Sequence, residues 1–145
     1  MEIIMDIFDK IIAGEIPSYK VYEDDTVLAF LDISQVTPGH TLVVPKNHVS
    51  DIFDYDTTTS ENVLLKLPMI ARAIKASNPK ITGINIQSNN GASAGQTVLH
   101  SHWHLIPRFD DDGLSGTLAP TIDNSEQFST ARYQKIADDI AKQLN

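Results

Sequence analysis

The sequence has no cysteine, so a disulfide framework and a zinc site with thiolate ligands are both excluded. It also has no cluster of lysine and arginine, and its formal net charge at pH 7 is −8. Proteins that bind nucleic acids usually carry a basic patch, so this charge argues against a polynucleotide partner and leaves a single nucleotide open. No long apolar run is present, and we therefore expect no membrane span.

The first ten residues contain three acids, Glu2, Asp6 and Asp9, which is not the basic and then apolar pattern of a secretory signal. We therefore expect the protein to be cytoplasmic. The chain has 145 residues, 41% of them hydrophobic, and neither a linker nor an internal repeat divides it. This length is enough to bury one core, so the sequence predicts a single domain over residues 1–145.

Three of the five histidines stand at alternate positions, His100, His102 and His104. In a β-strand alternate side chains share one face, so a strand here would set three imidazoles in a row. Three interpretations fit such a row. It could be a solvated or hydrogen-bonded strand face, a metal site, or a centre for phosphorus chemistry in which one imidazole attacks and its neighbours hold phosphate oxygens. The spacing alone does not choose among them.

Hydrophobic periodicity along the chain predicts an α+β fold with an antiparallel sheet. The expected elements are a helix over 6–13, strands over 19–23, 27–31 and 41–44, a helix from 57–60 to about 74, a strand over 84–87, the histidine strand within 97–108, and a helix from about 125. Pro68 lies inside the long helix, where its missing N–H predicts either a kink or the start of a second helical segment, and we favour the kink. Asn124 or Ser125 is the expected N-cap of the last helix.

The expected loops also carry informative residues. His40 stands at the start of the third strand, and His48 lies just beyond its end, where by itself it is typical of a solvated loop. Residues 88–95 are mostly small, so backbone N–H groups there could approach an anion. The acidic stretch 109–116 is typical of a surface excursion.

The histidine stretch resembles the signature of the histidine triad family of nucleotide hydrolases and transferases, His-φ-His-φ-His-φ-φ, in which φ is apolar. Upstream blocks are similar to the family in order and spacing at 6–17, 22–25, 28–34 and 38–46. The resemblance covers residues 5–108 and leaves 109–145 as a C-terminal excursion and helix. It is greatest for the branch that hydrolyses adenosine phosphoramidate and for its bacterial relatives.

The resemblance implies a HIT-like fold, an antiparallel five-stranded sheet with helices, and a homodimer with a ten-stranded sheet. It also implies that His102 attacks the α-phosphorus of a nucleotide to give a nucleotidyl-histidine, which water then hydrolyses. Neutral imidazole is a competent nucleophile near pH 7. Its Nδ1–H must bind a partner, for which we expect a backbone carbonyl, so that Nε2 carries the free lone pair.

Other site residues follow from the same resemblance. His104 would contact phosphate oxygens, with His100 and His40 as a supporting shell. Gln96 and Thr97 would face the phosphate and the leaving atom, and Asn89 matches the asparagine of the same loop. Asp32 would bind the ribose hydroxyls. The apolar walls around the base would be Ile7, Phe8, Ile11, Phe30 and Ile33.

Two departures from the family pattern concern the histidines. Ser101 stands where the signature has an apolar residue, so we expect it to affect packing more than catalysis. Several bacterial relatives bind zinc through two cysteines and the histidines equivalent to His48 and His100, but here the cysteine positions are Asp6 and Asp9. Carboxylates can also bind zinc, yet a pair of them is a poorer closed site. We expect hydrogen bonds or ion pairs there instead, and no required cofactor.

The function that the resemblance implies is hydrolysis of purine nucleoside 5′-phosphoramidates. One alternative is a dinucleoside polyphosphate hydrolase, which would need a second nucleotide pocket. The other is a nucleotide-binding or metal-binding regulatory module that acts through a partner protein.

Overall fold

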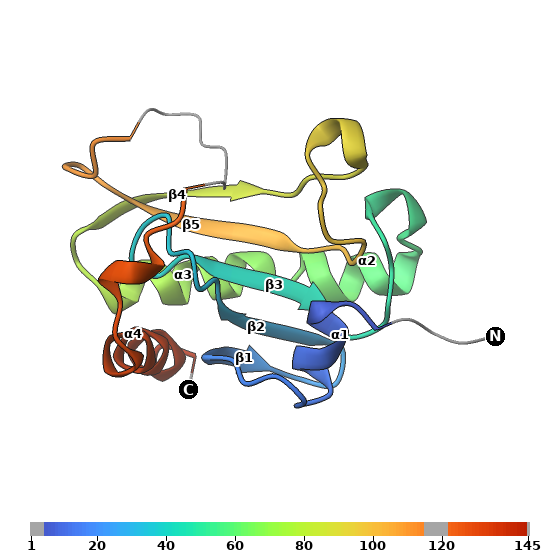
Figure 1. Cartoon of the computed structure of the whole chain (residues 1–145), viewed down its shortest axis with the longest axis horizontal. Helices are drawn as coiled ribbons and strands as arrows, with labels where there is room; N and C mark the ends of the chain where they lie inside the picture. The colour runs from blue at the N-terminus through green and yellow to red at the C-terminus, as the bar shows by residue number, and fades with distance from the viewer. Residues whose placement is uncertain (1–4, 115–121, 145) are drawn as a thin grey trace.

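The computed structural model describes residues 5–114 and 122–144, which form helices packed on one antiparallel sheet. In chain order the elements are α1 (Ile7–Ile12), β1 (Lys20–Glu23), β2 (Val27–Leu31), β3 (Thr41–Pro45), η1 (Ile52–Asp54), α2 (Thr57–Leu64), α3 (Leu67–Ser77), β4 (Ile81–Gln87), η2 (Ala92–Ala94), β5 (Trp103–Phe109), η3 (Ser125–Gln127) and α4 (Thr130–Lys142). The sheet order within these residues is β1-β2-β3-β5-β4 (Figure 1). This confirms the predicted α+β fold. No helix in the described part of the chain is long and apolar enough to cross a membrane.

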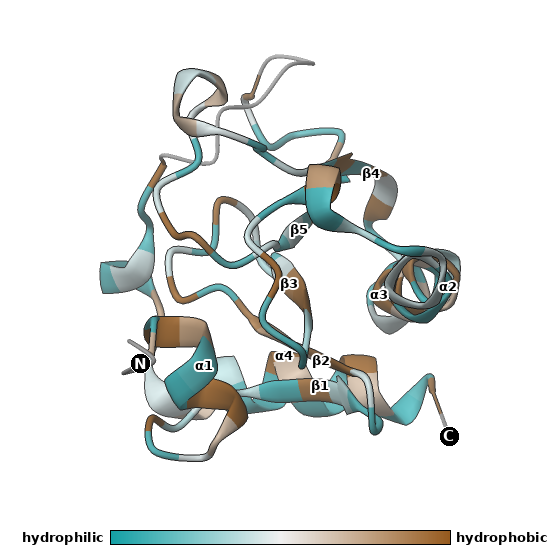
Figure 2. Ribbon diagram, turned by 90° about the vertical axis from the view of Figure 1, so that its right-hand side faces the viewer, coloured by the Kyte–Doolittle hydropathy of each residue, from teal (hydrophilic) through white to brown (hydrophobic). Residues whose placement is uncertain are grey.

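The helices cover both faces of the sheet. Figure 2 shows α1 on one side of β3 and α3 on the other, and α4 packs against α3, β1 and β2. All residues of β2 are buried, and alternate side chains enter opposite cores. Leu28 and Phe30 pack with Phe8 of α1, whereas Ala29 and Leu31 join the larger core beneath α3 and α4. The smaller core, under α1, is the one that adjoins the histidines.

Helix α1 begins and ends where its sequence predicts. The Asp6 carboxylate accepts a hydrogen bond from the Asp9 N–H at 2.7 Å, and the Asp9 carboxylate accepts one from the Asp6 N–H at 3.1 Å. This reciprocal capping box satisfies two N–H groups at the start of the helix. Gly14, with φ of +80°, follows the helix in the left-handed conformation that glycine adopts most easily.

Pro68 lies in the first turn of a second helix, α3, which is one of the two outcomes expected of it, and the favoured kink is wrong. Proline is tolerated in a first helical turn because its N–H is not needed there. Two predicted boundaries are also wrong. Strand β4 starts three residues earlier than the expected 84. Helix α4 starts at Thr130, because Ser129 rather than Asn124 or Ser125 accepts the capping hydrogen bond, from the Arg132 N–H.

The histidine strand is also shorter than predicted. Strand β5 begins at Trp103, so only His104 of the three spaced histidines lies in it. The Ser101 N–H donates instead to the Val49 carbonyl at 2.7 Å, in the irregular segment after β3. The expected excursion at 109–116 extends beyond the described residues. Its described part is held by Asp112, which pairs with Arg108 at 2.8 Å.

Candidate active site

His102 lies just before β5. A backbone carbonyl and a side chain of α1 orient its ring. Its Nδ1 is 2.7 Å from the His100 carbonyl oxygen, which can only accept, so Nδ1 carries the proton and Nε2 carries the lone pair. This is the backbone contact that the sequence predicted. The Phe8 ring packs against the imidazole with 4.9 Å between ring centroids. Burial lowers the pKa of His102, so the ring is neutral at pH 7.

His40 and His104 form a hydrogen-bonded chain beside His102. The Val36 N–H donates to His40 Nδ1 at 3.3 Å, which leaves the His40 proton on Nε2. That Nε2 lies 2.8 Å from His104 Nδ1 and donates to it, so the proton of His104 is on Nε2. Burial and the neighbouring imidazoles lower the pKa of His104 strongly, and burial lowers that of His40. His104 is therefore a neutral N–H donor, 5.3 Å from the His102 ring between centroids.

Asp32 lies in the turn between β2 and β3, and one of its two carboxylate oxygens already accepts hydrogen bonds. Its Oδ1 accepts hydrogen bonds from the Ser34 N–H at 2.8 Å and the Ser34 hydroxyl at 2.7 Å. Its Oδ2 lies 3.6 Å from His40 Nε2 and 3.8 Å from His104 Nδ1, beyond hydrogen-bonding distance. This second oxygen is therefore the one that can accept from a ligand.

A largely apolar cavity of about 330 Å³ opens between α1 and β2. Its lining includes the six predicted pocket residues, Ile7, Phe8, Ile11, Phe30, Asp32 and Ile33. It also includes residues that the sequence did not single out: Ile16, Pro17, Ser18, Tyr19, Leu31, Leu42 and Val98. Since Phe8 contacts the His102 ring, the cavity and the imidazole share a wall. A ring in this cavity would lie next to the histidines.

The side chain of Gln96 is engaged within the loop before His100. Its amide N–H groups donate to the backbone carbonyls of Ser50 and Val98, so this buried side chain braces the loop in this conformation. The role of Gln96 toward a phosphate stays a prediction. Thr97 is exposed and Asn89 is half-buried at the start of the same loop, and their roles stay predictions.

A second cluster joins two carboxylates of α1 to two histidines. The buried His100 ring donates from Nε2 to the Pro45 carbonyl at 2.8 Å, so its other nitrogen faces the carboxylates. His100 Nδ1 lies 3.3 Å from Asp6 Oδ2 and 3.2 Å from Asp9 Oδ1, and His48 Nδ1 lies 3.1 Å from Asp9 Oδ2. A lone pair on His100 Nδ1 would repel the carboxylate oxygens of Asp6 and Asp9. The space between these atoms therefore needs either a proton on Nδ1 or a bound cation.

The geometry of this cluster fits a metal ion as well as a proton. Each of its four residues offers a ligand atom, and these atoms lie within 4.8 Å of one another. Bonds of about 2.0 Å to a tetrahedral metal separate the ligand atoms by about 3.3 Å, close to the distances above. All four positions would be filled by side chains, so a metal here would tie α1 to the segment before β5 without an open position for substrate.

Gln35 organises the turn that carries Asp32 and His40, a role that no sequence pattern indicated. Its side chain is fully buried, and its backbone adopts a φ of +42°. The amide N–H groups donate to the Asp32 carbonyl at 2.6 Å and the His40 carbonyl at 2.8 Å, and the amide oxygen accepts from the Gly39 N–H. A glutamine in a turn is typical of the surface, so only the fold reveals this role.

Ser101, the polar exception in the histidine stretch, has a partner that the sequence did not indicate. Its side chain is buried, and its hydroxyl lies 2.7 Å from the Tyr55 hydroxyl, which also accepts from the Trp103 indole at 3.1 Å. The serine therefore replaces an apolar contact with a hydrogen bond, away from the His102 ring.

Comparisons with known proteins agree with this architecture. The HIT domain family model matches residues 13–111. Protein hit from Bacillus subtilis is 46% identical over 138 residues, 95% of this chain and 93% of that protein. Adenylylsulfatase HINT3 from Arabidopsis thaliana is 40% identical over 111 residues, 74% of this chain and 54% of that protein. The solved structure of a hypothetical histidine triad nucleotide-binding protein from Sulfolobus tokodaii superposes with a TM-score of 0.81 at 30% identity, over 94% of this chain and 90% of that one.

Proposed function

Because the chain belongs to the family of HIT domain proteins, we propose that it is a nucleotide hydrolase that cleaves purine nucleoside 5′-phosphoramidates through a nucleotidyl intermediate on His102. The observation that carries this proposal is the hydrogen bond between His102 Nδ1 and the His100 carbonyl, which leaves Nε2 free to attack. The names of two relatives, an adenylylsulfatase and a nucleotide-binding protein, support the same class of chemistry.

The reaction proceeds in two displacements at phosphorus. His102 Nε2 attacks the α-phosphorus, the phosphorus–nitrogen bond of the substrate breaks, and the amine leaves after taking up a proton from solvent water. A second water then attacks the same phosphorus and gives up a proton to the solvent, the bond to His102 breaks, and the nucleoside monophosphate departs. The Nε2–H of His104 donates to a non-bridging oxygen, where negative charge is stabilised by a donor already held in place.

Substrate recognition uses the cavity beside the histidines. The free Asp32 Oδ2 is a natural acceptor for ribose hydroxyls, and the walls formed by Phe8, Phe30 and Ile33 suit a flat base. The base therefore enters the apolar cavity, and the ribose directs the α-phosphate toward His102.

Hydrolysis by this route requires no metal cofactor. The nucleophile and the phosphate donor are neutral imidazoles, and neither belongs to the cluster of Asp6, Asp9, His48 and His100. We assign that cluster to hydrogen bonds and ion pairs, because the thiolates that favour zinc are absent.

The protein acts as a homodimer joined through the edge of its sheet. Among residues 5–114 and 122–144, strand β4 has a neighbour, β5, on one side only, and Ile86 of β4 is 47% exposed. Pairing of two such edges would make a ten-stranded sheet and cover both. Light scattering of the purified protein should give the mass of two chains, and the mass of one chain would contradict this assignment.

The test of the activity is turnover of adenosine 5′-phosphoramidate by the wild type and by the His102→Ala variant. The variant should lose several orders of magnitude in kcat/KM while it keeps nucleotide binding. Full activity in the variant would refute the mechanism. A panel with guanosine and cytidine phosphoramidates, adenosine 5′-phosphosulfate and diadenosine polyphosphates then identifies the preferred leaving group and base.

Genetic complementation separates the hydrolase from a regulatory binding module. A deletion phenotype should be rescued by the wild-type gene and not by the His102→Ala gene. Equal rescue by both would assign the cellular role to binding.

A further inference from the structure

The turn that carries Asp32 and His40 is bound along its backbone by the C-terminal part of the chain. The Asn124 N–H donates to the Ser34 carbonyl at 2.7 Å. The Asn124 amide donates to the Gln35 and Val36 carbonyls, both at 3.1 Å. Together with the hydroxyl of Tyr133, which donates to the Ile33 carbonyl, these contacts occupy four consecutive carbonyls of the turn.

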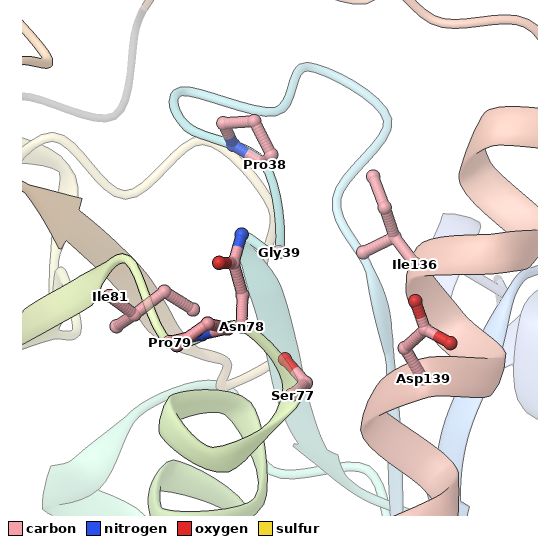
Figure 3. Close-up of a pocket in the computed structure, with 8 residues that line it drawn as sticks. All are labelled: Pro38, Gly39, Ser77, Asn78, Pro79, Ile81, Ile136 and Asp139. Atoms are coloured by element: carbon pink, nitrogen blue, oxygen red, sulfur yellow. The ribbon is translucent and has the colours of Figure 1, made fainter.

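Asn124 and Tyr133, which we call the C-terminal clamp, lie outside the proposed reaction centre. Neither lines the apolar cavity beside the histidines. Tyr133 also stacks on Tyr19, a cavity residue, with 4.8 Å between ring centroids. Figure 3 shows α4 running beside the same turn, with Ile136 across a small hollow from Pro38. The clamp therefore supports one wall of the proposed nucleotide site from outside the cavity.

Hydrogen bonds lead from the clamp through Ser34 to Oδ1 of Asp32, the carboxylate oxygen beside the free one. Asn124 holds the Ser34 carbonyl, and the Ser34 N–H and hydroxyl both hold Asp32 Oδ1. Because Oδ1 is held, the direction of Oδ2 depends on the position of Ser34. The left-handed backbone of Gln35 between these contacts makes the turn costly to hold without partners.

We propose that Asn124 and Tyr133 are positioning residues that set the affinity of the site for ribose through Asp32. This inference rests on the proposed function, in which Asp32 binds the ribose hydroxyls. The C-terminal segment therefore contributes to substrate specificity. Loss of the clamp weakens binding of the ribose and leaves the reaction at the histidines unchanged.

The test compares Asn124→Ala with Gln134→Ala, which removes an exposed amide from α4. Hydrolysis of adenosine 5′-phosphoramidate is measured beside that of its 2′,3′-dideoxy analogue. Asn124→Ala should raise KM for the ribose substrate about tenfold with kcat within about twofold, and should leave the dideoxy substrate almost unchanged. Gln134→Ala should behave as the wild type. Tyr133→Phe, which keeps the stacked ring, should shift KM in the same direction and serves if Asn124→Ala does not fold.

Combination with Asp32→Ala provides a second readout. If the clamp acts through Asp32, adding Asn124→Ala to that variant should raise KM no further. Equal losses on ribose and dideoxy substrates, or additive effects with Asp32→Ala, would overturn the clamp alone. If the wild type binds adenosine monophosphate without turnover, the proposed hydrolase fails and the same comparison is made on dissociation constants. Absence of nucleotide binding by the wild type would overturn both proposals.

Discussion

Three imidazoles that are wholly or partly buried should make the folded protein sensitive to mild acid. Burial lowers the pKa of His40, His102 and His104 below the ordinary value of 6.5, so each imidazole takes up its proton at a lower pH in the folded state than in the unfolded chain. In the unfolded chain each takes up a proton as the pH falls below 6.5. The unfolded state then binds more protons than the folded state, so the free energy of unfolding decreases as the pH is lowered from 6.5. Above pH 6.5 these groups do not change it.

The size of the effect follows from the pKa values. An imidazole that stays neutral on folding costs roughly 1 to 2 kcal/mol at pH 5.5, one unit below its unfolded pKa. The pKa of His104 is lowered to about 3, so His104 contributes this full amount. The lowered pKa values of His40 and His102 add to this loss in the same direction, against the roughly 5 to 15 kcal/mol typical of a domain.

The assay is urea unfolding at pH 7.5 and pH 5.5, followed by the fluorescence of Trp103, the one tryptophan of the chain. The urea midpoint should fall markedly at pH 5.5. Ordinary carboxylates titrate at lower pH, and the pKa values of Asp24 and Asp112 are lowered further by their hydrogen bonds, so they contribute little in this window. The His104→Asn variant should show a smaller drop. Equal midpoints at the two pH values, or an unchanged drop in the variant, would refute the reasoning.

Three other predictions test the surroundings of the histidines. Gln35→Ala removes three hydrogen bonds to the backbone of the turn and leaves the Gly39 N–H without its partner, so it should lower the free energy of unfolding by about 3 kcal/mol in urea titration. Ser101→Ala removes one buried hydrogen bond and should cost about 1 kcal/mol, with kcat/KM within about twofold of the wild type. Elemental analysis should find well under one zinc per protomer, and a chelator should change neither activity nor melting temperature. About one tightly held zinc, with a chelator-induced drop in melting temperature that Asp9→Ala reproduces, would assign the cluster to a metal instead.

Local rules were enough to predict much of the fold from the sequence. Helix α1 and strand β2 depend on near neighbours, and each lies where the pattern indicated. The hydrogen bond that orients His102 spans only two residues, so it too could be foreseen. The residues around the cavity followed from the family resemblance rather than from periodicity.

Tertiary structure alone decided the features that depend on distant partners. Strand β5 begins at Trp103 because pairing with β3 starts there, opposite Val43, and no periodicity reveals that limit. The proton positions of His40 and His104 depend on a contact 64 residues apart in the chain. The Tyr133 contact with Ile33 spans 100 residues. Such contacts form only after the sheet and α4 have packed, and the sequence around each residue looks like an ordinary turn or helix surface.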